Sequence, residues 1–139
     1  MTGGAEQNKE KVRLFVEAVL NEGRLELIDE LVGDDYVGHV PDAGEGVFGP
    51  QGLRRLVASR RSACPGLHVR ILDQIAEDDR VATHWRAISG ASAPGIPVHS
   101  CEGISIVRLL AGKQVDSHTE YALPLAAALT PRSPRGARP

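Results

Sequence analysis

The chain has 139 residues, a formal charge of −2 and a pI near 6.2. This length is enough for one domain with its own core and too short for two ordinary ones. The slightly acidic balance excludes a generally basic surface, so we expect no nucleic-acid partner. No apolar run approaches the roughly 18 residues that span a bilayer, and no signal peptide is recognisable. We therefore expect a cytoplasmic protein without membrane attachment.

The two cysteines, Cys64 and Cys101, could form a disulfide or remain free. Free thiols are expected in a reducing compartment. The sequence contains no Cys-X-X-Cys or His-Glu-X-X-His pattern, so we predict no metal site.

Helical periodicity dominates the first half of the chain. After about seven residues that we expect to be disordered, Asn8 is predicted to cap a helix that runs to about Asn21. A shorter helix covers residues 25–32. A third begins at Pro50, in the favoured first-turn position, and ends before Cys64.

Alternating apolar and polar residues dominate the second half, which indicates strands. The last two strands are joined by a short turn and form a β-hairpin. The predicted strands cover residues 67–72, 80–89, 104–109 and 114–121, after a short extended piece at 36–40. Residues 41–49 and 90–97 are predicted to be loops.

Helices followed by antiparallel strands indicate an α+β fold. We expect the helices to cover one face of a curved, mostly antiparallel sheet, which makes a cone with an internal pocket. The domain is predicted to cover residues 8–129. Residues 130–139, rich in Pro, Arg and Gly, form a tail with too little apolar surface to order itself.

The last strand carries the most suggestive polar side chains. Its period of two places Asp116, His118 and Glu120 on one face, and Ser117 and Thr119 on the other. One of these faces is expected to line the pocket. The trio could carry chemistry there, or it could form a solvated or interface face of the sheet.

Several short phrases, in their order and spacing, resemble the SnoaL-like polyketide cyclase family of the nuclear transport factor 2-like fold. The resemblance covers roughly residues 9–129. The phrases are Asp34-Asp35-Tyr36-Val37-Gly38-His39, Gly49-Pro50-Gln51-Gly52-Leu53, Cys64-Pro65-Gly66-Leu67-His68-Val69, Asp79-Arg80-Val81 and Gly103-Ile104-Ser105-Ile106-Val107-Arg108 with Gly112-Lys113.

The resemblance implies a cofactor-free enzyme that closes a ring by intramolecular aldol chemistry on a polyketide-derived or similarly apolar, oxygenated small molecule. The last strand of such cyclases carries the proton-transfer acid, and the corresponding phrase here is His118-Thr119-Glu120. We predict Glu120 as the general acid/base and His118 as its partner. A carboxylate in an apolar pocket becomes a better base because burial disfavours its charged form.

Seven further residues are predicted to bind the substrate. Trp85 would offer a flat wall, Tyr36 a hydroxyl donor and Ser105 a hydrogen bond or simply room. For each, a purely structural role competes with the functional one. The full set is Trp85, Tyr36, Ser105, His99, His39, Phe15 and Phe48.

Two other functions are compatible with the same fold. One is an epoxide hydrolase or isomerase, although the Asp-Arg-Asp arrangement of such hydrolases would need other residues where the chain has Trp85 and Ala87. The other is a non-catalytic accessory protein that binds a small molecule. The resemblance also implies a homodimer that pairs through the outer face of the sheet.

Overall fold

The computed structural model describes residues 4–41, 43–90 and 99–121. The helical elements are α1 (Gly4–Leu14), the π-helix η1 (Phe15–Asn21), the short 3-10 helix η2 (Leu25–Leu27), α2 (Ile28–Leu31) and α3 (Gly49–Ala63). The strands are β1 (Val32–His39), β2 (Val47–Phe48), β3 (His68–Glu77), β4 (Arg80–Ser89), β5 (His99–Leu110) and β6 (Lys113–Tyr121). Predictions for residues 1–3, 91–98 and 122–139 fall outside the described ranges.

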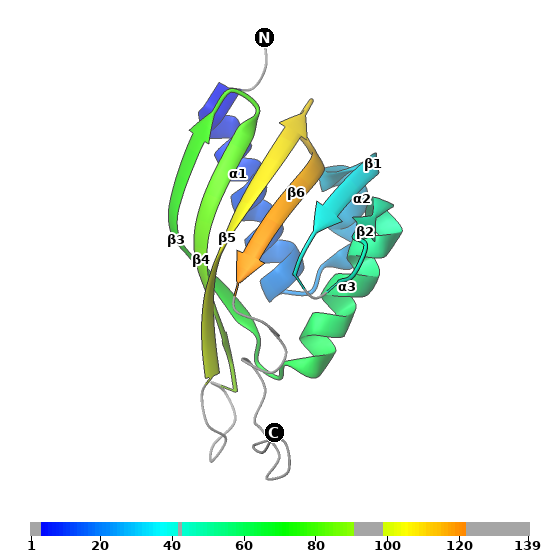
Figure 1. The fold of residues 1–139 in the computed structure, drawn as a ribbon, viewed down its shortest axis with the longest axis vertical. Helices are drawn as coiled ribbons and strands as arrows, with labels where there is room; N and C mark the ends of the chain where they lie inside the picture. The colour runs from blue at the N-terminus through cyan, green and yellow to red at the C-terminus, as the bar shows by residue number, and fades with distance from the viewer. Residues whose placement is uncertain (1–3, 42, 91–98, 122–139) are drawn as a thin grey trace.

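The six strands form one open, curved sheet with the order β2-β1-β6-β5-β4-β3. Every neighbouring pair is antiparallel except β1 and β6, which run parallel. The helices lie on one side of the sheet, with α1 behind β3 to β5 and α3 beside β1 (Figure 1). The predicted α+β architecture, with helices on a curved and mostly antiparallel sheet, is confirmed.

The first helix departs from its predicted start. It begins at Gly4, and Asn8 is a buried residue inside it rather than its cap. The Asn8 side chain instead donates a hydrogen bond to the backbone oxygen of Asp78, 3.4 Å away in the turn between β3 and β4. Local capping preference would place the Asn8 side chain at the helix end. Instead, its amide makes a tertiary contact with the turn between β3 and β4.

The core consists of three groups of buried side chains. The largest lies under the helices and includes Val19, Ile28, Val32 and Val57. A second holds Trp85 with both cysteines, which are buried and free as expected, and a third joins Val12 of α1 to β4 and β5. In the described ranges, no helix is long and apolar enough to cross a bilayer.

Candidate ligand-binding pocket

An apolar cavity of about 180 Å³ lies between the helices and the inner face of the sheet. Members of all three core groups contribute to its wall, among them Phe15 of η1, Leu53 of α3 and Val107 of β5. Directly paired residues on neighbouring strands share a face, so the inner faces of β4, β5 and β6 form one continuous surface of this cavity. The polar groups on that surface define what the pocket can bind.

Tyr36 and Ser117 form the most buried polar pair in the pocket wall. Their hydroxyl oxygens lie 2.7 Å apart, and either hydroxyl can donate. Tyr36 is only 4% exposed. Burial raises the pKa of Tyr36 above 10.0, the nearby Asp116 carboxylate raises it further, and the hydrogen bond with Ser117 partly opposes both. Tyr36 is therefore a neutral phenol at any physiological pH.

A second polar chain crosses the sheet at Trp85, Ser105 and Thr119. The indole Nε1 of Trp85 donates to Ser105 Oγ at 3.0 Å, and Ser105 Oγ lies 2.9 Å from Thr119 Oγ1. An indole N–H can only donate, so Ser105 accepts that bond. The two hydroxyls hold two hydrogens and share one bond, which leaves one hydrogen available to another acceptor.

The Trp85 ring lies against Gly103, its direct partner on β5. A Cβ at Gly103 would overlap the ring, so the glycine makes room for the indole. The Tyr121 ring packs edge-on against Trp85, with centroids 5.9 Å apart. These contacts keep the aromatic wall in place.

Arg60 of α3 is the one permanently charged side chain among the described residues that line the pocket. Its Nη2 donates to the hydroxyl of Tyr121 at 3.0 Å. Burial raises the pKa of the Cys64 thiol, and the Arg60 charge opposes part of that rise. The described lining residues include no carboxylate and no imidazole.

The predicted acid/base pair lies on the other side of β6. Since Ser117 and Thr119 face the cavity, His118 and Glu120 must face outward, and their side chains are 63% and 73% exposed. His118 Nε2 lies 3.3 Å from Glu120 Oε2, and the His39 and His118 rings are 5.3 Å apart. The expectation that these side chains enter the pocket is not met, and their catalytic role stays a prediction.

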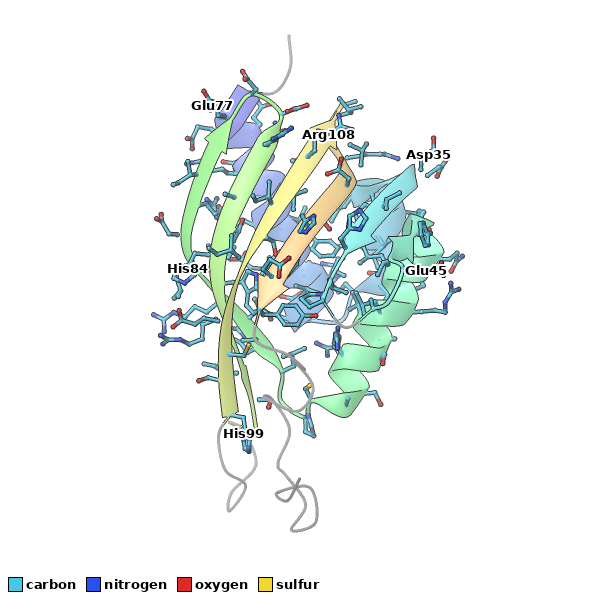
Figure 2. All side chains as sticks on the ribbon, viewed as in Figure 1. Asp35, Glu45, Glu77, His84, His99 and Arg108 are labelled. Carbon is cyan, nitrogen blue, oxygen red and sulfur yellow. The ribbon has the colours of Figure 1, made fainter. Side chains whose placement is uncertain are left out.

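The other predicted site residues divide clearly. Trp85, Tyr36, Ser105 and Phe15 line the cavity, whereas the described lining does not include His39, His99 or Phe48. Phe48 is 58% exposed because its neighbour in β2, Val47, takes the buried position. His99 is the first residue of β5 and lies at the end of the sheet (Figure 2). Its Nε2 is buried and has no hydrogen-bond partner among the described residues.

Sequence reasoning did not select Gln114 or Thr83, although both line the pocket. Thr83 could have been found, because strand alternation places it on the same face as Trp85. Gln114 could not have been found in this way. A β-bulge shifts the register of the hairpin between Arg108 and Leu109, so Gln114 and Ser117 both face inward despite their odd spacing.

The fold and pocket define a class of protein, the cone-shaped domains of the nuclear transport factor 2-like fold. The model of the SnoaL-like domain matches residues 12–118. The chain therefore belongs to the SnoaL-like family. No curated protein sequence matches it.

Solved structures agree with this fold at low sequence identity. A proposed SnoaL-like polyketide cyclase from Jannaschia sp. CCS1 superposes with a TM-score of 0.78 at 17% identity, over 100% of this chain and 98% of that one. Wild-type IdmH, a proposed polyketide cyclase from Streptomyces antibioticus, gives 0.72 at 21%, over 88% and 95% of the two chains. AclR, a proposed hydroxylase from Streptomyces galilaeus, gives 0.70 at 22%, over 90% and 96%.

Proposed function

We propose that the domain binds a small, apolar, carbonyl-bearing molecule of the polyketide type and polarises its carbonyl group through Tyr36. Polarisation makes the carbonyl carbon more open to attack by a carbanion, which is the electrophilic half of an aldol-type ring closure. The observation that carries the proposal is the buried Tyr36–Ser117 pair in an otherwise apolar cavity.

Counting hydrogens supports a donor role for this pair. Tyr36 and Ser117 hold two hydroxyl hydrogens and share one bond, and neither makes another hydrogen bond to a described side chain. One hydrogen is therefore left for a ligand oxygen. Because the surroundings are apolar, a hydrogen bond to a developing oxyanion is stronger there than in water.

The size of the cavity limits the ligand. A dry cavity of about 150 Å³ holds one benzene ring, whereas drug-sized sites reach about 300–1,000 Å³. A cavity of about 180 Å³ fits a molecule of one or two rings. Its apolar wall suits the ring body, and the hydroxyls suit its oxygens.

Trp85 provides the test, since it is the single tryptophan of the chain and forms part of the cavity wall. Its fluorescence can follow titration with 1-tetralone and with tetralin, a bicycle of similar shape without the carbonyl. Tyr36→Phe should weaken tetralone binding by about 3- to 10-fold, the value of one hydrogen bond, and leave tetralin binding unchanged. Equal tetralone affinity in both proteins would exclude Tyr36 as the donor, and a wild type that binds neither compound would refute the proposal.

A second candidate keeps Glu120 as the general acid/base and His118 as its partner, on a substrate that reaches the outer face of β6. Their mutual contact of 3.3 Å favours it, since each can orient the other. Turnover of a linear polyketide-type substrate by Glu120→Gln and His118→Ala would test it. If both variants lose turnover but still bind tetralone, the result supports the catalytic role of Glu120 and His118. Wild-type rates in both variants refute it, and ligand binding without any turnover by the wild type would indicate a binding protein.

We also infer that two copies pair through the outer face of the sheet. Ile75, Ile104 and Ile106 are exposed there. Around them lie paired charges of both signs, such as Arg86 with Glu102. A face that is apolar at its centre and mixed in charge at its edge is suited to contact a second copy of itself.

A further inference from the structure

Gln114, at the start of β6, is a buried side chain of the pocket wall. The residue is 3% exposed. No hydrogen bond joins its side-chain amide to another described residue, although the amide can make up to four. Among the described residues only His99 has a fully enclosed polar atom without a partner, so the Gln114 amide keeps contact with the space of the cavity. An amide that faces an apolar cavity without a protein partner is normally satisfied by a bound molecule, either water or a ligand.

The neighbours of Gln114 cannot supply that partner. It pairs with Leu109 on β5 and with Val32 on β1, and both side chains are apolar and buried. The β-bulge that turns Gln114 inward also places it beside the cavity rather than beside the solvent. A partner for the amide must therefore come from the cavity itself.

The position of Gln114 complements that of Tyr36 and Ser117. Ser117 follows on the same strand, and because of the bulge the partners of the two residues on β5, Val107 and Leu109, are only two residues apart, which corresponds to about 7 Å along the cavity wall. Two polar sites at this separation, with apolar wall between them, suit a bicyclic molecule with polar groups at opposite ends. Tyr36 would donate to one end, and Gln114 would bind the other.

We propose that Gln114 is a specificity residue that recognises a neutral ligand group with a hydrogen-bond donor beside an acceptor. This proposal rests on the proposed function of the pocket. A primary amide presents an N–H donor and a C=O acceptor side by side, so it forms two parallel hydrogen bonds with a lactam. A simple ketone can use only the donor, and a hydrocarbon can use neither.

Three bicyclic probes of nearly equal size separate these cases: 3,4-dihydroquinolin-2-one, which is a lactam, 1-tetralone and tetralin. By Trp85 fluorescence, the wild type should bind the lactam about 10-fold more tightly than tetralone, as expected for one extra buried hydrogen bond. Gln114→Met, which keeps the length of the side chain, should remove this preference and bind tetralin at least as well as the wild type.

Gln51→Met is the matched control, since Gln51 is an exposed glutamine on α3 outside the pocket lining. It should not change the order of the three affinities. NMR of the wild type gives a second readout that does not depend on a variant that folds. The side-chain amide protons of Gln114 should shift with the lactam and stay in place with tetralin.

The outcomes distinguish the two proposals. A wild type that binds none of the three probes refutes the proposed function and the role of Gln114 with it. Binding of tetralone that depends on Tyr36, without any preference for the lactam, refutes the role of Gln114 alone. A lactam preference that survives in Gln114→Met, or Gln114 amide signals that do not respond to the lactam, would overturn it in the same way.

Discussion

Tyr36 shows how individual residues shape the pocket. Its side chain lies along its own strand, directly beside Gly38. A Cβ at Gly38 would overlap the phenol oxygen of Tyr36. The glycine therefore allows the hydroxyl to reach Ser117 on β6, 81 residues further along the chain. Once there, the hydroxyl loses its contact with water, and this loss is the main reason for its raised pKa.

The raised pKa predicts how stability depends on pH. The folded state holds the Tyr36 proton more tightly than the unfolded state, whose pKa is near 10.0. This contribution to stability is complete below about pH 10 and is lost as the pH rises through the folded pKa. Urea unfolding from about pH 8 to about pH 11 should show the wild type losing stability relative to Tyr36→Phe only above about pH 10. A constant difference between the two proteins over this range would contradict the burial of the phenol.

Asn21 joins two elements at the end of the helical segment. Its Nδ2 donates to the backbone oxygen of Val69 at 2.9 Å, and its Oδ1 accepts from the backbone N–H of Val69 at 2.7 Å. The side chain thus pairs with the edge strand β3 as another strand would. Arg61 of α3 donates to the carbonyl oxygens of Leu20 and Asn21, which ties the same helix end to the third helix.

Asn21→Ala removes both hydrogen bonds with Val69 and should lower the free energy of unfolding by about 1–3 kcal/mol. Urea denaturation followed by circular dichroism would measure the change. Glu17→Ala, at an exposed position on the same helical segment, is the control and should stay within about 0.5 kcal/mol of the wild type. Equal stability of Asn21→Ala and the wild type would show that these bonds do not hold η1 to β3.

The molecule as a whole has two different sheet faces. The inner face is covered by helices and contains the cavity, whereas the outer face leaves Ile104 and Ile106 exposed at the centre of the sheet. The proposed homodimer would cover these side chains. Because the two faces are separate, disrupting the dimer should leave the pocket intact.

Ile106→Glu would place a carboxylate at the centre of the proposed interface and should convert the dimer to a monomer in sedimentation experiments. Its affinity for 1-tetralone should remain that of the wild type. Leu14→Glu makes a similar change at an exposed leucine on the helical side and should leave the dimer unchanged. A monomeric wild type, or a dimeric Ile106→Glu variant, would exclude this interface.

Local patterns predicted most of the elements. The strand at 80–89 was predicted with the bounds that β4 has, because alternation and a preceding turn mark it clearly. The third helix was predicted to within a residue, since Pro50 and Cys64-Pro65-Gly66 limit it at both ends. The two-residue strand β2 lies in the predicted loop, because only its pairing with β1 makes it a strand.

The sequence by itself determined the order of helices and strands, the hairpin and the membership of the SnoaL-like family, because these depend on periodicity and short phrases along the chain. Alternation in β6 showed that His118 and Thr119 face opposite sides. Only the tertiary structure decided which side is the pocket, because the helices that cover one face are distant in sequence. The bulge that turns Gln114 inward depends in the same way on pairing between strands. The tertiary structure therefore places Tyr36, Ser117 and Gln114 in the wall of the candidate pocket, and His118 and Glu120 on the outer face of the sheet.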